Sequence, residues 1–187
     1  MSTDAAPKRA DALRNRERVV AAAAAVFGER GIEASVPDVA ARAGVGKATV
    51  YRSFPTKEHL IAAILIDKME AFEARARELL DEPDAWTALH ELMSEKAVEH
   101  CLDRTLAAAL QAGASPDLLA EGRRRMWGAV EALMDRAKAQ GTMRESATSA
   151  DVRVLWGGAT RMLTADDVAD PDEWRRYAGL VLDALRA

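Results

Sequence analysis

Signals that begin and end α-helices recur along the whole chain and constrain its fold more than any other feature. Ser35-Val36-Pro37-Asp38 and Ser115-Pro116 each combine a capping side chain with a proline that suits a first helical turn. Glycines stand where helices should end, as at Gly31, Gly44 and Gly141. Between these signals Ala, Leu, Glu and Arg dominate, and no segment has the pattern of a strand. The sequence therefore predicts an all-α fold.

About nine helices are predicted, each bounded by such signals. They cover residues 9–30, 35–43, 46–53, 56–80, 85–101, 102–111, 115–140, 148–163 and 170 to the C-terminus. Residues 1–8 are expected to be a disordered lead-in. Of the 187 residues, 49% are apolar and 30% charged, which is typical of a folded globular protein rather than a disordered one.

The apolar runs and the cysteine content of the sequence indicate the cellular compartment. No apolar run approaches the roughly 18 residues that span a bilayer, and no signal peptide is evident. Cys101 is the only cysteine, so no internal disulfide can form, which fits a reducing environment. We expect a cytoplasmic protein that has no membrane partner and needs no metal or other cofactor.

Charge is distributed unevenly along the chain. Residues 1–62 carry ten Lys and Arg against seven Asp and Glu, whereas the remainder carries 16 basic and 23 acidic residues. The overall net charge is −4. A basic N-terminal third on an acidic body is what local neutralisation of phosphates would need, although chance asymmetry is the alternative.

The most informative stretch runs from Ser35 to Leu60. It predicts two short helices joined at Gly44, with Ala40, Val45 and Val50 small or β-branched enough for a steep, close crossing. The second helix has an apolar side and a polar side whose donors suit phosphates and base edges. This is the helix-turn-helix arrangement, in which the second helix enters the major groove of DNA. The same geometry also occurs in proteins that never bind DNA. The polar side carries Lys47, Thr49, Tyr51, Arg52 and Ser53.

These residues, with their neighbours, resemble the N-terminal signature of the TetR family of transcriptional regulators. The resemblance covers about residues 9–65 at fixed spacing. It rests on Val19-Val20, Ala22-Ala23, Phe27, Gly31, Val39-Ala40, Ala43-Gly44-Val45, Thr49-Val50-Tyr51, Phe54, Lys57-Glu58 and Leu60.

The resemblance implies roles for individual positions. Thr49 and Tyr51 match residues that touch the DNA backbone or base edges, Arg52 lies where backbone contact is usual, and Lys57 matches a phosphate-binding lysine at a helix N-terminus. Lys47 and Ala48 occupy positions that face bases, where Ala48 could meet a thymine methyl. The full predicted DNA-binding set is Ser35, Arg42, Lys47, Ala48, Thr49, Tyr51, Arg52, Ser53 and Lys57.

Three positions depart from the family pattern. Gly46 replaces the common serine before the recognition helix, and Ser53 replaces a frequent aromatic residue or histidine. Pro37 stands where some members place a base-reading side chain. These departures leave DNA binding expected but the operator sequence undefined.

The resemblance also implies a domain plan: a DNA-binding domain at residues 9–56, then a ligand-binding and dimerisation domain at residues 57–187. Bulky apolar residues and a histidine could line a cavity for a lipophilic effector, or simply fill the core. These are Trp86, His90, Met93, Met126, Trp127, Met134 and Trp156.

The last two predicted helices are expected to pair with their symmetry mates as a four-helix bundle. Adjacent glycines, which weaken a helix, would be explained by close approach of another helix. The predicted dimer residues are Val154, Gly157, Gly158, Trp174, Tyr177, Ala178, Val181 and Leu185.

Other function classes have weaker support. His90, Glu91, His100, Cys101 and Asp103 are the only cluster that resembles a catalytic or metal-binding set. A helix places the two histidines roughly 80° apart, and no HExxH, CxxC, GxSxG, phosphate-loop or GxGxxG motif occurs. The sequence predicts a ligand-responsive repressor that binds a palindromic operator as a homodimer. A helical interaction module, or an activator of the same fold, is the alternative.

Overall fold

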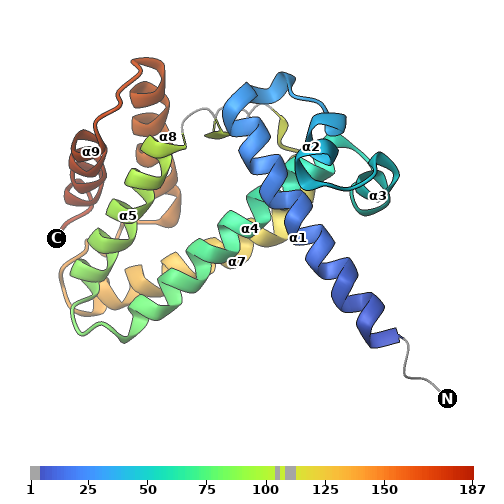
Figure 1. Cartoon of the computed structure of the whole chain (residues 1–187). Coiled ribbons are helices and arrows are strands. Elements are labelled where there is room, and N and C mark those ends of the chain that lie inside the picture. The colour runs from blue at the N-terminus through green and yellow to red at the C-terminus, as the bar shows by residue number, and fades with distance from the viewer. Residues whose placement is uncertain (1–4, 104–105, 108–112) are drawn as a thin grey trace. The chain divides into compact units, whose positions relative to one another are not determined.

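The computed structural model describes residues 5–103, 106–107 and 113–187, and within these ranges the fold is entirely helical (Figure 1). One isolated bridge, between Met143 and Arg186, is the only strand-like pairing in this part of the chain. The predicted helix at 102–111 falls largely outside the described residues. The helices are α1 (Ala5–Arg30), α2 (Val36–Ala43), α3 (Lys47–Ser53), α4 (Lys57–Glu78), α5 (Ala85–Leu102), α7 (Pro116–Ala139), α8 (Ser149–Ala165) and α9 (Pro171–Asp183), with 3₁₀ turns at Gly31–Glu33 and Leu79–Asp81.

Capping side chains begin several of these helices, as the sequence predicts. Ser35 and Asp38 form a reciprocal capping box at the start of α2, and Thr148 and Asp151 form another at the start of α8. Each box satisfies backbone N–H groups that have no partner inside the helix. Asp170 accepts from the N–H of Asp172 before α9.

The start of α1 differs from the prediction. The helix begins at Ala5 rather than Arg9, so residues 5–8 are helical rather than disordered. Two alanines favour helix, and Pro7 lies in the first turn, where its missing N–H costs no hydrogen bond.

The chain divides into two compact units. The first contains the described residues up to Asp67, together with 106–107 and 113–119. Its core joins α1, α2, α3 and the first turns of α4, and its largest fully buried side chains are Phe27, Phe54, Leu60 and Ile61. Here α1 packs along α2, which in turn contacts α3.

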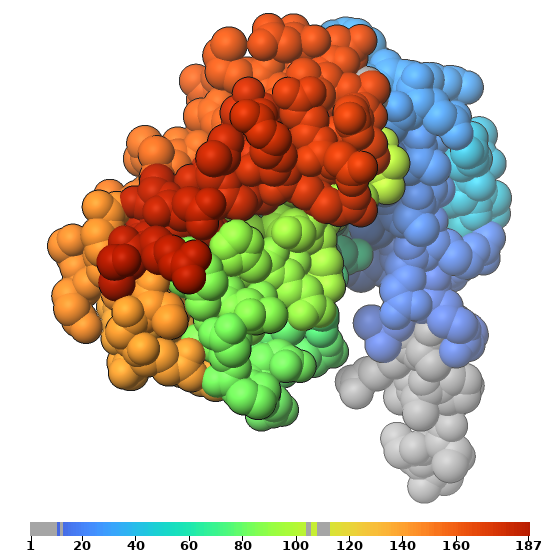
Figure 2. Space-filling view, turned by 90° about the vertical axis from the view of Figure 1, so that its left-hand side faces the viewer, coloured from blue at the N-terminus to red at the C-terminus, as the bar shows by residue number. Residues whose placement is uncertain are grey.

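The second unit contains residues 68–103 and 120–187. In it α9 lies along α5, as Figure 2 shows with α9 in red over α5 in green. Trp174 is fully buried between these helices and donates its indole N–H to the Val168 carbonyl at 2.9 Å. Gln140 fixes the entry to α5, because its amide binds the Pro83 carbonyl and the Ala85 N–H at 2.8 and 2.9 Å.

The division between the units falls inside α4, between Asp67 and Lys68. The sequence places the domain boundary earlier, between residues 56 and 57. The difference arises because the first turns of α4 bury Leu60, Ile61 and Ile64 in the core of the first unit. A continuous backbone helix therefore belongs to both units. Among the described residues, no helix has the length and apolar character needed to cross a membrane.

We predict that Gly44→Ala destabilises the protein by about 1–2 kcal/mol, because Gly44 has φ +66° and ends α2 in the left-handed conformation that a Cβ disfavours. The free energy of unfolding from urea titration, followed by circular dichroism, measures the effect. The matched control is Gly128→Ala. Gly128 lies inside α7 with nothing within 4 Å of the place that a Cβ would take, so alanine there should stabilise by up to about 1 kcal/mol. Equal stability of Gly44→Ala and wild type would contradict the argument.

Candidate nucleic-acid interface

The helix α3 is held by one apolar side and presents a polar side outward. Val50 is fully buried, and Phe54, which caps the C-terminal end of α3, is 2% exposed. Glycine at the N-cap position supplies an extended conformation without a side-chain hydrogen bond. The outward side carries Lys47, Ala48, Tyr51, Arg52 and Ser53, all exposed, with Thr49 half-buried beside them.

The turn between α2 and α3 is braced from α1. The guanidinium of Arg18 donates to the Ala43 carbonyl at 2.7 Å, satisfying an acceptor at the C-terminal end of α2. The same guanidinium lies 3.4 Å from the position that a Cβ on Gly44 would take. Because α1 carries this contact, it helps to fix the angle at which α3 leaves the turn.

Three of the predicted DNA-binding side chains have partners within the protein. Arg42 makes a paired interaction with Glu29, at 2.5 and 3.1 Å. Ser35 is part of the capping box at α2. Lys57 donates to the Ile32 carbonyl, and its ammonium lies 5.5 Å from the centre of the Phe27 ring.

These partners lower carboxylate pKa values around the helix-turn-helix. Hydrogen bonds from the Ser35 hydroxyl and backbone N–H lower the pKa of Asp38, which also lies 3.3 Å from Arg30. The hydrogen bond and charge of Arg42 lower the pKa of Glu29. Both acids therefore stay ionised at neutral pH and offset nearby cations, whereas α3 contains no acid. Among the described residues, the two exposed cations of α3, Lys47 and Arg52, have no carboxylate partner.

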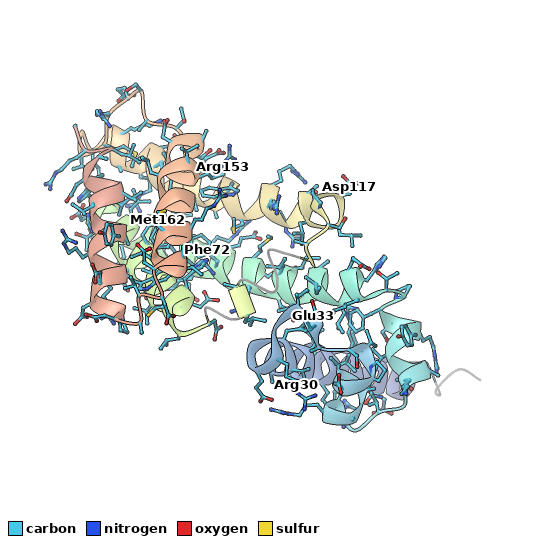
Figure 3. The ribbon with its side chains drawn as sticks, turned by 90° about the horizontal axis from the view of Figure 1, so that it is seen from above. Arg30, Glu33, Phe72, Asp117, Arg153 and Met162 are labelled. Atoms are coloured by element: carbon cyan, nitrogen blue, oxygen red, sulfur yellow. The ribbon has the colours of Figure 1, made fainter. Side chains whose placement is uncertain are left out.

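The residues predicted to bind an effector fall into two groups in the second unit. Trp86, Met93 and Met134 are buried in its core. His90, Met126, Trp127 and Trp156 are half-buried. His90 meets the edge of Trp86 at 5.4 Å between ring centres, and Arg153 lies over Trp127 at 5.4 Å. Figure 3 labels Arg153 on α8.

The residues predicted to form the dimer interface also divide. Four of the eight, Trp174, Ala178, Val181 and Leu185, are buried within the unit and are therefore not presented on its surface. Trp174 and Ala178 of α9, with Leu185 just beyond its end, belong to the core that α9 shares with α5. Val154, Gly157 and Gly158 are exposed on α8, and Tyr177 is half-buried. The structure adds Leu155, Met162 and Leu180, which are 39%, 58% and 49% exposed.

A half-buried charge network, which the sequence pattern did not predict, joins α4 and α5. The Lys68 ammonium binds Glu99 at 2.5 Å and Asp103 at 2.9 Å, and Lys96 binds Glu99 at 2.7 Å. Burial alone would raise the pKa of Glu99, but the charges and hydrogen bonds of the two lysines outweigh it and lower the pKa to about 2. The sequence did contain a signal for this network, because the charged residues 96, 99 and 103 share one face of a helix.

Next to this network His100 lies among aromatic rings. It stacks on Trp174 at 6.3 Å and meets Trp156 edge-on at 5.9 Å, and its Nδ1 lies 3.0 Å from the Lys96 carbonyl. Burial lowers the pKa of His100, and the Lys96 charge acts in the same direction. The ring is therefore neutral at pH 7.

This three-helix unit, with Val50 and Phe54 buried and the polar side of α3 exposed, has the arrangement of a helix-turn-helix, in which α3 is the second helix of the motif. Two family matches make the class specific. Residues 19–64 match "Bacterial regulatory proteins, tetR family", and residues 84–187 match "Transcriptional regulator SbtR-like, C-terminal domain". The chain belongs to the TetR family of transcriptional regulators, whose members are DNA-binding regulators with a ligand-binding domain rather than enzymes.

Solved structures of similar proteins agree with this assignment. A TetR regulator from Streptomyces coelicolor, SCO0520, is 32% identical over 91% of this chain and 98% of its own, with a TM-score of 0.65. One from Mycobacterium vanbaalenii is 28% identical over 97% and 100%, with a TM-score of 0.63. FadR from Bacillus subtilis, solved in complex with stearoyl-CoA, is 18% identical over 90% and 98% and has a TM-score of 0.74, which shows the shared fold. No curated protein sequence matches the chain.

We predict that Glu99→Gln lowers stability at pH 7 and makes it less sensitive to acid. The folded pKa of about 2 lies below the ordinary 4.5, so ionised Glu99 stabilises the fold above pH 4.5 and this contribution is lost as pH falls toward 2. With the side chain 37% exposed, we expect a loss of about 1 kcal/mol after solvent screening.

Urea titrations at several pH values between 2 and 7 measure this effect. Glu121→Gln is the control, because Glu121 pairs with Arg124 on an exposed face of α7 and should matter less at pH 7. An unchanged pH profile in Glu99→Gln would contradict the role given to the network.

Proposed function

We propose that this protein is a repressor that binds a palindromic operator as a homodimer and is released by a small, lipophilic effector. The observation that carries the proposal is the exposed polar side of α3, fixed by the burial of Val50 and Phe54. A helix presented in this way can enter the major groove of B-DNA, where base edges differ in their donors and acceptors. An activator of the same fold is the second candidate, since operator position rather than structure separates the two.

Within this proposal the side chains of α3 contact different groups of the DNA, according to their length and chemistry. Arg52 and Lys47 bring long, charged donors to phosphates and to guanine edges. The Tyr51 hydroxyl and Thr49 donate to the backbone, and Ala48 meets a thymine methyl group. Ser53 extends the same side at the C-terminal end of the helix.

The residues that have internal partners act differently. Lys57 is proposed to bind a phosphate at the start of α4, and it must then leave the Ile32 carbonyl. Arg42 would exchange its exposed pairing with Glu29 for a phosphate, an exchange made easy by the weakness of surface ion pairs. Ser35 contributes through the cap of α2 and the orientation of its first turn.

An exposed apolar stripe on α8 supports the homodimer, and α9 adds exposed Leu180. Val154, Gly158 and Met162 are four residues apart and follow one face of α8, and nothing lies within 4 Å of a Cβ placed on either glycine of the 157–158 pair. Figure 3 labels Met162 on this helix. Such a face suits close packing against the same face of a second copy around a two-fold axis. The proposed interface comprises Val154, Leu155, Gly157, Gly158, Met162, Tyr177 and Leu180.

A pocket borders this stripe. It has a volume of about 510 Å³, with Val154 and Leu155 on its rim and Ala184 and Leu185 among its other lining residues. A surface of this kind, part apolar and indented, suits a self-complementary interface. Two-fold symmetry would place the two copies of α3 roughly 34 Å apart, at successive major grooves of a palindrome.

Effector release is proposed to act through α4, whose backbone runs through both units. An effector that binds the second unit better in the released state shifts the dimer away from the operator, and DNA must reciprocally weaken effector binding. Half-buried Trp127, Trp156 and Met126 are adaptable contacts for such a ligand. FadR, which shares the fold, was solved with stearoyl-CoA, and this supports a lipophilic effector class. A compound that binds the second unit and leaves operator affinity unchanged would contradict this coupling.

We predict that the protein binds the DNA upstream of its own gene more tightly than a scrambled duplex at near-physiological salt. Tyr51→Ala and Arg52→Ala should each weaken specific binding by about 1–3 kcal/mol, because each removes a donor from the exposed side of α3. Fluorescence anisotropy measures both duplexes. Arg124→Ala, an exposed arginine on α7, is the matched control and should change neither. Equal weak binding to both duplexes would leave only charge attraction and count against an operator at that location.

We also predict that Leu155→Glu combined with Met162→Glu converts the proposed dimer to a monomer. Both side chains are exposed in the single chain, and the two new charges would be buried when the stripes of two copies pack together. Light scattering coupled to size-exclusion chromatography measures the mass, and operator affinity should fall with it. Leu102→Glu is the matched control, since Leu102 is 72% exposed at the end of α5. A double variant that keeps the dimeric mass would place the interface elsewhere.

A further inference from the structure

The first half of α1 contributes no described side chain to the core of its unit. Every described side chain from Asp11 to Arg18 is exposed or half-buried, and the first buried residue is Val19. Leu13 is 60% exposed. In Figure 1 the helix runs on beyond α2 and α3, which cover only its second half. A helix of 26 residues therefore carries, ahead of Val19, a segment in which no described side chain is buried in the core of its unit.

This segment, residues 5–18 of α1, is called here the basic arm. It carries Lys8, Arg9, Arg14, Arg16 and Arg18 against two acids, Asp11 and Glu17. Arg14 has an exposed partner one turn away, Asp11, and surface pairs of this kind exchange readily for a stronger anion. The arm is thus a cationic helix whose own acids do not balance its charge.

Two contacts tie the arm to the DNA-binding helices. Arg16 lies over the Phe54 ring, with its guanidinium carbon 4.6 Å from the ring centre. Phe54 caps the C-terminal end of α3, just beyond Tyr51 and Arg52. Arg18, nearer the core, holds the end of α2. The exposed, cationic side chain of Arg16 is therefore placed beside the end of the recognition helix.

We propose that the basic arm binds phosphates of the operator outside the base pairs that α3 reads, with Arg16 and Arg14 as its contacts. The inference rests on the proposed operator binding and deepens it by extending the footprint along the duplex. Arginine presents a planar fork of donors that matches phosphate oxygens. Stacking on Phe54 restricts the Arg16 side chain before binding, so less conformational freedom is lost when it meets a phosphate. The arm reads no sequence, and its contribution is affinity rather than specificity.

The test is the salt dependence of operator affinity, measured by anisotropy from low to moderate potassium chloride. The variant Arg14→Gln/Arg16→Gln removes two charges per protomer and keeps good helix formers. Each lost phosphate contact should lower the slope of log K against log salt by about 0.9, so a dimer should lose about 3.6. Affinity should fall for native and scrambled duplexes alike, so that their ratio is retained. Hydroxyl-radical footprints should lose protection at the outer edges only.

Matched controls separate a phosphate contact by the arm from a general loss of charge and from an apolar contact. Arg124→Gln removes an exposed arginine that also pairs with an acid one turn away, but on α7 of the second unit, and should leave the slope unchanged. Leu13→Gln tests an apolar contact by the arm and should also leave the slope unchanged. The single variant Arg14→Gln leaves the Arg16–Phe54 contact intact, so it serves if the double variant fails to fold. It should give half of the change in salt slope.

The outcomes are distinguishable from failure of the proposed function. If wild type prefers the native duplex but the arginine variants keep its slope and footprint, the arm inference is overturned and operator binding stands. Loss of binding in Leu13→Gln, with the arginine variants unaffected, overturns it in favour of an apolar partner. If wild type prefers no DNA fragment, the proposed function itself fails.

Discussion

The structure of the DNA-binding unit depends on the burial of Val50 and Phe54, because α3 is only seven residues long. An isolated helix of this length is unstable in water, since nucleation costs more than a few hydrogen bonds return. Packing of these two side chains against α1 and α2 therefore decides both that α3 exists and which side it presents. The left-handed Gly44 and the Arg18 contact at Ala43 set the turn through which this packing is reached.

In the second unit a charge network joins α4 to α5, beside Phe72 and Ala76 of α4, which pack in the core of that unit. Lys68 is the first residue of that unit on α4, immediately after Asp67, which belongs to the first unit. Its pairing with Glu99 and Asp103 fixes the second half of a helix whose first half is buried among the DNA-binding helices. The backbone of α4 is thus held by different residues in its two halves.

Local signals predicted most of the helices and the site on α3. The cap at Ser35, the helix start at Thr148 and the helix end at Gly44 are where the sequence placed them, since caps and backbone conformation depend on neighbouring residues. The exposed side of α3 was also predicted, because Val50 and Phe54 mark its apolar side and the polar residues fall on the other. The dimer residues on α9 were not, since Trp174 and Ala178 proved to face α5. An amphipathic pattern gives a helix an apolar side but does not say whether that side meets its own core or a partner.

The sequence by itself determined the all-α class, most of the helix ends and the helix-turn-helix, because propensity, capping and turn conformation are free energies of residues close together in the chain. Tertiary structure alone decided which charges are free. Arg42 is paired with Glu29 and Lys57 with Ile32, whereas Arg16 rests on Phe54 with its charge exposed, and these partners lie between 13 and 38 positions away. No local rule relates residues at such separations, since their proximity follows only from how the helices pack.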